Sequence, residues 1–210
     1  MGSKGDMTRE KILSVAEGII LQKGFSATSI DEIIQQSKIT KGGFFYHFSG
    51  KNELAGALIQ RYLVQDDKFF NSLFERADSL SEDPFQQMLI FLKLLSEAMA
   101  DLPNGHPGCL VASFAYESMQ FEEEVLALTA EGIISWRKLF LDRLEHIASR
   151  YSMKIEVSLA ELADMLTAVV EGGIVMSLVT KNPDLLVQQI LQYRTYLRLL
   201  FEGPTVPQLH

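Results

Sequence analysis

Residues 39–54 constrain the fold of this chain more than any other part of the sequence. They read ITKGGFFYHFSGKNEL, with a glycine pair followed at once by a cluster of aromatic residues. A helix this short is unstable alone in water, so its aromatic side chains must pack on neighbouring helices. The glycine pair leaves the first turn bare, with backbone donors open to an anion. Such a helix is suited to insertion into the major groove of DNA.

The residues upstream predict two further helices that complete a helix-turn-helix. The first is expected to begin with Thr8 as its N-cap and to end at Lys23-Gly24, where a cation and a glycine are typical of a helix end. The second is expected to begin after Thr28 or Ser29, each a good N-cap. Apolar residues recur in both at helical spacing: Ile12, Leu13, Ala16, Ile19, Ile20, Ile30, Ile33 and Ile34.

The spacing of these elements resembles the N-terminal domain of TetR-type transcriptional repressors. The resemblance covers residues 8–54 and rests on Thr8-Arg9-Glu10-Lys11-Ile12-Leu13, Lys23-Gly24-Phe25, Thr28-Ser29-Ile30, Ile33, Lys41-Gly42, Phe48 and Lys51-Asn52-Glu53-Leu54. In that family, the positions of Phe45 and His47 usually hold tyrosines, and the resemblance implies contacts with backbone phosphate there. Phe45 lacks the hydroxyl for such a contact, whereas His47 keeps a donor.

The bare helix and the resemblance together predict which residues meet double-stranded DNA. We expect Lys41 and the backbone amides of Gly42 and Gly43 to lie against the DNA, with Thr28 and Lys51 on phosphate. The full predicted set is Thr28, Ser29, Lys38, Thr40, Lys41, Gly42, Gly43, Phe44, Tyr46, His47 and Lys51. A two-fold dimer is what a palindromic operator needs.

Charge is the feature that argues against DNA binding. The chain carries a net charge of −8, and residues 1–60 hold seven Lys or Arg against six Asp or Glu. The predicted head is therefore close to neutral, whereas DNA-binding domains are usually basic. However, Lys38, Lys41 and Lys51 cluster around the predicted third helix. We expect modest affinity for DNA with a clear dependence on salt.

Composition limits the class of protein. At 210 residues and 47% hydrophobic content, one or two domains with a real core are expected. No apolar run approaches the ~20 residues of a membrane span, so we expect no membrane partner. Residues 1–7 lack the apolar stretch of a signal peptide and are expected to form a flexible arm. A single cysteine fits the reducing cytoplasm.

The remainder of the chain is predicted to be helical, with no strand of useful length. Helices are expected over 54–77, 84–101, 110–119, from 122, over 158–180 and over 182–200, with a proline- and glycine-rich loop over 102–108. The fold class is therefore all-α: a helix-turn-helix domain over 1–54, then a larger helical effector-binding and dimerisation domain over 55–210. The helix over 54–77 is expected to be the only covalent route between them.

Aromatic and methionine residues at helical spacing fill the predicted second domain. They are more often plain core, but together they can line an adaptable apolar cavity, and the family resemblance favours an effector pocket there. The candidate effector-binding residues are His106, Cys109, Phe114, Tyr116, Glu117 and Trp136. The expected effector is an unknown apolar, aromatic or electrophilic small molecule.

Cys109 has two interpretations that the sequence leaves open. A lone cysteine is more often a buried small hydrophobe. Here it follows a Pro-Gly turn at a predicted helix start, and a protonated His106 nearby would favour a reactive thiolate. Gly-Cys-Leu at this position also resembles a TetR-type subgroup in which the equivalent cysteine senses electrophiles.

Small residues mark the helix predicted over 158–180. They cost helix stability and permit close approach of another helix, either within the chain or in a dimer. We favour a four-helix interface between two copies, built from this helix and the one after it. The predicted interface residues are Ala168, Gly172, Gly173, Tyr193 and Leu197.

Signs of catalysis are weak, so we expect no enzyme activity, cofactor or metal. The histidines lack metal-ligand spacing, no glycine loop is built to cradle phosphate, and His106 with Cys109 lacks an orienting third group. The alternative to a DNA-binding regulator is a helical adaptor for protein interaction whose helix-turn-helix has lost its contact with DNA.

Overall fold

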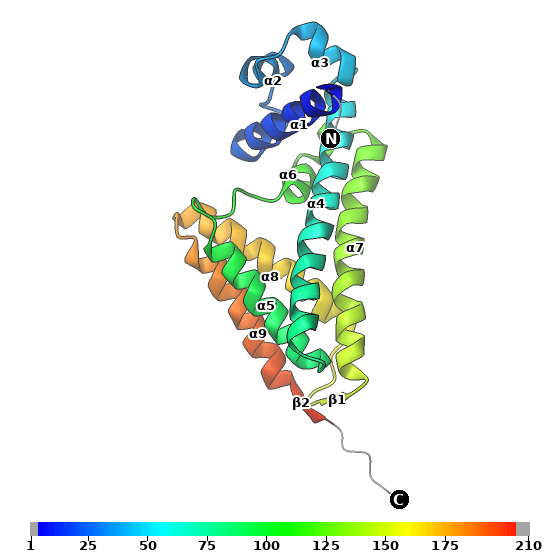
Figure 1. Ribbon diagram of the computed structural model, residues 1–210, viewed down its shortest axis with the longest axis vertical. Coiled ribbons are helices and arrows are strands. Elements are labelled where there is room, and N and C mark those ends of the chain that lie inside the picture. The colour runs from blue at the N-terminus through cyan, green and yellow to red at the C-terminus, as the bar shows by residue number, and fades with distance from the viewer. Residues whose placement is uncertain (1–3, 205–210) are drawn as a thin grey trace, which may run out of the picture. The chain divides into compact units, whose positions relative to one another are not determined.

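The protein is almost entirely helical in its structure, a computed structural model that describes residues 4–204 (Figure 1). The all-α class is confirmed, and Pro84 and Ser158 open helices as predicted. In chain order the elements are α1 (Lys4–Lys23), α2 (Ile30–Ser37), α3 (Lys41–His47), α4 (Lys51–Leu80), α5 (Pro84–Ala100), α6 (Leu110–Tyr116), the 3-10 helix η1 (Ser118–Gln120), α7 (Glu123–Ala148), β1 (Tyr151–Met153), α8 (Leu159–Thr180), α9 (Asp184–Leu200) and β2 (Phe201–Pro204).

The first helix begins earlier than predicted. α1 is already helical at Lys4, so Thr8 lies inside the helix and is not its N-cap. Asp6 lies in the first turn, where a carboxylate favours the positive end of a helix. The predicted flexible arm is therefore wrong for residues 4–7, and residues 1–3 lie outside the described range.

The chain packs into two compact units. Unit 1 comprises residues 1–66 and 107–132, and unit 2 comprises residues 67–106 and 133–210. The chain thus passes from one unit to the other at residues 66–67, 106–107 and 132–133. α4 is therefore one of three covalent connections between these units, whereas the expected single route joined residues 1–54 to the rest of the chain. The packing also groups α6 and the start of α7 with the N-terminal helices, whereas the sequence placed the division at residue 54.

Unit 1 forms around the apolar stripe of α1. Ile12, Ala16 and Ile20 are buried, as their helical spacing predicts. Phe114 of α6 packs on Phe25, the residue after the turn that ends α1, with 5.6 Å between ring centroids. Phe121, just before α7, lies 4.5 Å from the same ring. These aromatic contacts, which span long sequence separations, pack residues 107–132 against residues 1–66 within unit 1.

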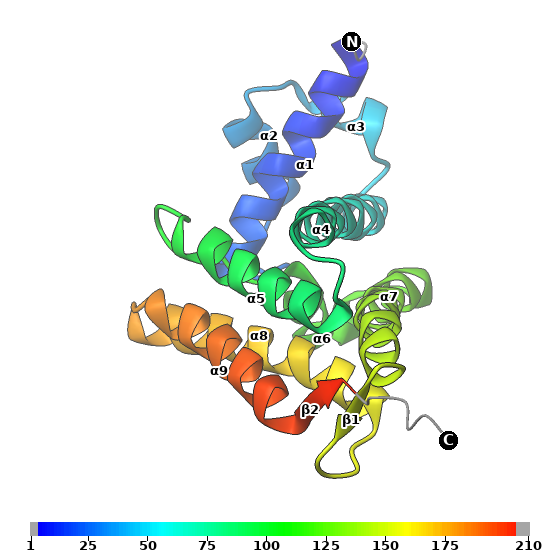
Figure 2. The same ribbon diagram turned by 60° about the horizontal axis from the view of Figure 1, so that its bottom comes forward.

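Unit 2 is held by close packing of α5, α8 and α9, which lie side by side in Figure 2. A Cβ added at Gly173 of α8 would come within 2.9 Å of Leu186 of α9. The Tyr193 hydroxyl donates to the Leu162 carbonyl at 2.8 Å. Gly173 of α8 therefore serves packing within the chain, which was the alternative interpretation of the small residues in this helix.

Two short strands were not predicted. β1 and β2 pair antiparallel, with Met153 opposite Phe201. Phe201 is buried, and its ring centroid lies 5.5 Å from that of Phe85 at the start of α5. Strands of three and four residues are too short to show alternation in a sequence.

α8 contradicts the expectation that no segment is long and apolar enough for a membrane span. It has 22 residues, a mean hydropathy of 1.7 over its most apolar stretch, and 33% of that stretch buried. Length and composition alone are weak evidence, since the core helix of a protein that never enters a membrane passes the same test. α8 packs along one side on α9, so part of its apolar surface belongs to the core of unit 2.

Candidate nucleic-acid interface

The start of α2 is held by a side-chain cap. Ser29 is the N-cap, and its hydroxyl accepts a hydrogen bond from the Glu32 amide at 3.2 Å. Thr28 is buried instead, and its hydroxyl donates to the Gly24 carbonyl at 2.8 Å. Thr28 therefore loses the basis for its predicted phosphate contact, whereas Ser29 remains exposed.

A tight turn leads from α2 to α3. Lys38 has a left-handed backbone, with φ of 53°, and its amide donates to the Gln35 carbonyl at 3.2 Å. The Ile39 amide donates to the Ile34 carbonyl at 3.3 Å. These bonds satisfy the last carbonyls of α2 and leave the Lys38 side chain exposed beside α3.

α3 is fixed by its cap and by two aromatic anchors. The Thr40 hydroxyl accepts from the Gly43 amide at 3.0 Å, so this amide already has a partner. Phe44 and Phe48 are buried, with 5.8 Å between their ring centroids. The aromatic residues thus dock the short helix, as its length requires. Phe44 belongs to the core, and the prediction that it meets DNA is wrong.

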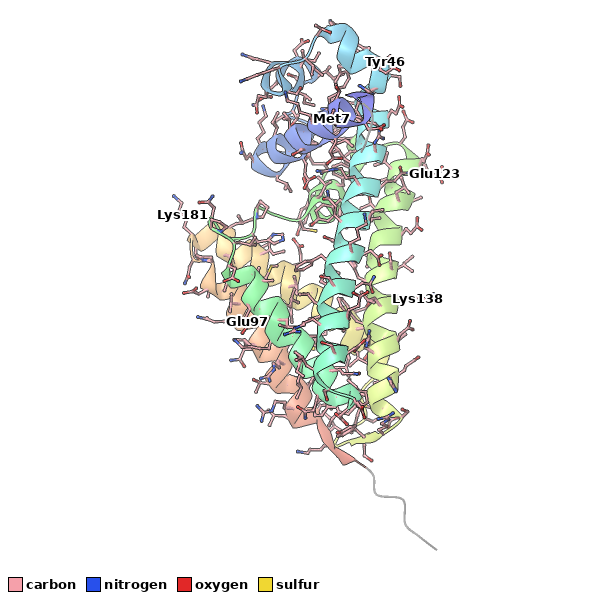
Figure 3. All side chains as sticks on the ribbon, viewed as in Figure 1. Met7, Tyr46, Glu97, Glu123, Lys138 and Lys181 are labelled. Atoms are coloured by element: carbon pink, nitrogen blue, oxygen red, sulfur yellow. The ribbon has the colours of Figure 1, made fainter. Side chains whose placement is uncertain are left out.

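The other face of α3 is open. Lys41 and Gly42 are exposed, and His47 is half-buried. Tyr46, marked in Figure 3, is 82% exposed, and Phe45 is 45% exposed. Sequence reasoning left Phe45 out of the contact set because it lacks the hydroxyl expected there. Helical period could have placed it, since Phe45 is out of phase with the buried pair four residues apart.

Gly42 is a glycine that the protomer itself does not require. A Cβ added there would meet nothing within 4 Å, whereas one at Gly43 would lie 3.2 Å from the Thr40 hydroxyl oxygen. Alanine would favour a helix over glycine by about 0.5–1 kcal/mol. A bare and exposed first turn beside Lys41 fits the close approach of an external backbone.

Lys51 points into unit 1 rather than outward. Its ammonium donates to the Phe25 carbonyl at 2.7 Å and lies 4.1 Å from the centroid of the Phe25 ring. Burial lowers the pKa of Lys51, and the Glu117 carboxylate works in the opposite direction. Its predicted contact with phosphate is not the arrangement in this structure.

The predicted effector-binding residues are divided between the units. His106 and Trp136 belong to unit 2, and Cys109, Phe114, Tyr116 and Glu117 belong to unit 1. Phe114 is fully buried in the aromatic core, and Tyr116 is 81% exposed. Glu117 accepts a hydrogen bond from the Phe25 amide at 2.6 Å. Within unit 1, Phe114 is therefore a core residue, Tyr116 is a surface residue and Glu117 is bound to the chain itself. These three side chains do not form a common ligand site.

Cys109 is half-buried at the N-cap of α6, and its side chain makes no cap hydrogen bond. Burial, and then the proximity of Cys109, raise the pKa of Tyr62 on α4. One turn later, burial and then the Glu17 carboxylate raise the pKa of Asp66 to about 7. Burial lowers the pKa of His106, so the protonated imidazole expected to activate the thiol is disfavoured. The sequence did not indicate Tyr62 or Asp66, because only the fold brings α4 beside α1 and α6.

The predicted dimer surface is exposed only in part. Gly173, Tyr193 and Leu197 are buried within unit 2, so they do not form an outer surface, and that part of the prediction is wrong. Ala168 and Gly172 are exposed. They belong to an outer stripe of α8, defined as Met165, Ala168, Gly172, Val175, Met176 and Val179, whose exposed members recur every three or four residues.

The described part of the chain shows no candidate metal site. No group of three or more His, Cys, Asp or Glu side chains in residues 4–204 is placed to hold an ion.

A capped helix, a tight turn and a docked short helix with an open face define a helix-turn-helix DNA-binding protein. Residues 12–58 match the family described as bacterial regulatory proteins, tetR family. Residues 84–190 match the C-terminal domain described as transcriptional regulator LmrA/YxaF-like. The chain belongs to the TetR family of bacterial transcriptional regulators, with a C-terminal domain of the LmrA/YxaF-like type. It is therefore a DNA-binding regulator and not an enzyme.

Relatives found by sequence and by structure are also transcriptional regulators. The HTH-type transcriptional regulator LmrA of Bacillus subtilis (strain 168) is 28% identical over 86% of this chain and 90% of its own length. The regulator YxaF of the same organism is 27% identical over 87% of this chain and 90% of its own. The crystal structure of a TetR-family regulator from Agrobacterium tumefaciens, 19% identical, superposes with a TM-score of 0.78 over 95% of this chain and 100% of its own.

Proposed function

We propose that this protein is a cytoplasmic repressor that binds a palindromic operator as a homodimer and releases it when a small molecule binds. The observation that carries the DNA-binding step is the open face of α3, where Lys38 and Lys41 are exposed beside the bare Gly42. The exposed rings of Phe45 and Tyr46 extend this face. Base and phosphate contacts of this kind need donors and cations on the helix that enters the major groove.

The outer stripe of α8 is the proposed contact between two copies. Val175 is 43% exposed, and Met165, Met176 and Val179 expose further apolar surface along the same helix face. A continuous apolar face of this kind is costly in water and is typical of a protein interface. A two-fold contact there would place two recognition helices about 34–36 Å apart, or a multiple of that distance, as successive major grooves require.

The effector is proposed to be an apolar or aromatic small molecule held by unit 2. Trp136 on α7 is half-buried and is the one tryptophan of the sequence. Its fluorescence therefore reports ligand binding without a label. A saturable change on titration with an aromatic compound, absent in Trp136→Phe, supports the site. A compound that releases DNA without changing the fluorescence would place the effector elsewhere.

An electrophile acting on Cys109 is the other form of the switch. Mild alkylation followed by a DNA gel shift tests it. Loss of binding in wild type but not in Cys109→Ser identifies the thiol as the trigger. An identical response in both proteins makes Cys109 structural and leaves induction to the non-covalent site.

The DNA-binding step is tested with fragments of the promoter that precedes the chain's own gene. We expect the wild type to shift one fragment, with affinity that falls as salt rises. Lys41→Ala should weaken binding by about 1–2 kcal/mol, the range of one good charged contact. Lys138→Ala, which removes an exposed lysine of α7, is the matched control. A wild type that shifts no fragment, or Lys41→Ala that binds like Lys138→Ala, contradicts this placement, and the first result favours a protein-binding adaptor.

A further inference from the structure

Glu117 lies at the C-cap of α6 and connects that helix to the DNA-binding head. Its carboxylate accepts hydrogen bonds from the Phe25 amide at 2.6 Å, from the Ser26 amide at 2.8 Å and from the Ser26 hydroxyl. Both amides belong to the turn between α1 and α2, 91 and 92 residues away in sequence. Burial acts to raise the pKa of Glu117, but these donors and Lys51 outweigh it and lower the pKa. Glu117 is therefore ionised at neutral pH, and its hydrogen bonds are charge-assisted.

The turn is shaped to receive this carboxylate. Gly24 has φ of +86°, a conformation that side chains rarely adopt. A Cβ added to Gly24 would also lie 2.6 Å from Glu117 Oε1. Gly24 is thus required for two reasons: its positive φ disfavours a side chain, and a Cβ would collide with the Glu117 carboxylate. The two amides point to one anion, and that anion is supplied by α6.

Other contacts converge on the same turn. Phe25 packs on Phe114 of α6, and the Phe25 carbonyl accepts from the Lys51 ammonium of α4. Phe121, in the segment before α7, also packs on Phe25, with 4.5 Å between ring centroids. The turn that precedes α2 is therefore held by groups from α4, α6 and the segment before α7 at once.

The segment that carries Glu117 is also tied to unit 2 by the chain itself. Residues 107–132 belong to unit 1, but their neighbours at both ends, His106 and Ile133, belong to unit 2. A change in unit 2 can therefore pull on this segment from both ends. Glu117 would pass the displacement directly to the turn, only three residues before the Ser29 cap of α2.

We propose that the Glu117 carboxylate is a latch that holds α6 to the turn between α1 and α2, so that movement of α6 changes the placement of α2 and α3 and with it operator affinity. This inference rests on the proposed function as a DNA-binding regulator. It adds a second route for the signal beside α4. Because coupling is reciprocal, DNA bound at α3 must also favour the latched position of α6.

The test uses the full-length protein, the promoter fragment that the wild type shifts, and two isosteric variants. Glu117→Gln replaces an acceptor-only group with an amide that cannot accept all three hydrogen bonds. Glu123→Gln removes the same charge from an exposed position at the start of α7 and is the matched control. We expect Glu117→Gln to weaken operator binding about five-fold or more, the lower end of typical coupling between sites, and Glu123→Gln to bind like wild type.

Hydrogen–deuterium exchange separates a latch from a merely structural residue. In the wild type, added DNA should slow exchange of the α6 amides as well as those of α3. In Glu117→Gln, the protection of α3 should remain at saturating DNA while that of α6 is lost. Unchanged DNA affinity in Glu117→Gln, or wild-type α6 amides indifferent to DNA, would overturn the latch. A wild type that binds no DNA would instead overturn the proposed function.

A milder variant keeps the test decisive if Glu117→Gln does not fold. Ser26→Ala removes one of the three donors and leaves both backbone bonds possible. It should fold, as circular dichroism would verify, and should lose part of the DNA-induced protection of α6. Full protection of α6 in folded Ser26→Ala, together with wild-type DNA affinity, would count against the latch.

Discussion

The two glycine pairs of this chain, Gly42-Gly43 in α3 and Gly172-Gly173 in α8, repeat one arrangement on two surfaces. In each pair a Cβ added to the first glycine would meet nothing within 4 Å, whereas one on the second would meet the protomer itself. The neighbour is the Thr40 hydroxyl oxygen at 3.2 Å for Gly43 and Leu186 at 2.9 Å for Gly173. A dipeptide that looks uniform in sequence therefore contains one glycine facing inward and one facing outward.

The packing inside the protomer explains the second glycine of each pair but not the first, which suggests that the first faces another molecule. The inward glycines allow the helix cap of α3 and the α8–α9 contact. The outward glycines lower the stability of their helices, and no contact inside the protomer requires them. Their surroundings indicate the partner: Lys41 and Tyr46 beside Gly42 suit DNA, and Met165 and Val175 on the face of Gly172 suit an apolar surface such as a second copy.

The largest expected effect comes from Gly173→Leu. Its side chain would overlap both the Leu186 side chain and the Leu186 Cα, which is 3.1 Å from an added Cβ. Overpacking against backbone should lower the free energy of unfolding by about 3 kcal/mol, measured by urea denaturation. Gly172→Leu at the adjacent position should leave each protomer folded. Equal destabilisation by both variants would break the distinction between inward and outward glycines.

Val175→Glu should act on association rather than on folding. A charge placed in the outer stripe of α8 would be buried without a partner in the dimer, so we expect dissociation to be favoured by about 2 kcal/mol or more. Sedimentation at micromolar concentration would measure it as a shift to monomer. The matched control is Val64→Glu, because Val64 of α4 is a similarly exposed valine outside the stripe. A wild type that is already monomeric at this concentration would contradict the proposed interface.

Gly42→Ala should separate stability from binding. The added methyl meets open space, so the variant should gain about 0.5 kcal/mol of stability from helix propensity while DNA affinity falls. Thermal unfolding and a gel shift would measure the two effects. Gly18→Ala in α1, where a Cβ also meets nothing within 4 Å, should gain stability without losing affinity. Undiminished binding by Gly42→Ala would mean that its bare surface does not face the DNA.

Local chemistry made the helices and their order predictable. Ser29, Thr40, Asp83 and Ser158 all cap helices through side-chain oxygens, and Pro84 starts α5. Such signals act within one turn of helix, so a sequence displays them completely. The start of α1 was missed because Thr8, a favourable N-cap residue by type, lies inside the helix. The strands were missed because their pairing joins residues about 50 positions apart.

The faces of the helices were less predictable than their limits. Phe44 and Phe45 are adjacent and chemically identical, yet one is fully buried and the other 45% exposed. Lys51 was predicted to contact phosphate because it is a lysine near the recognition helix, but its ammonium donates a hydrogen bond to the Phe25 carbonyl. Glu117 looked like a ligand contact and instead binds the turn after α1. The positions of Lys51 and Glu117 depend on partners that are distant in sequence.

The sequence by itself determined the all-α class, the helix-turn-helix and the family, because caps, helical period and motif spacing are local properties that survive without tertiary contacts. Only the tertiary structure decided that residues 107–132 pack with the head, which glycine of each pair faces outward, and where Lys51 and Glu117 are bound. Those assignments depend on burial and on hydrogen bonds across long separations, which exist only once the chain has folded and brought α6 against the turn between α1 and α2.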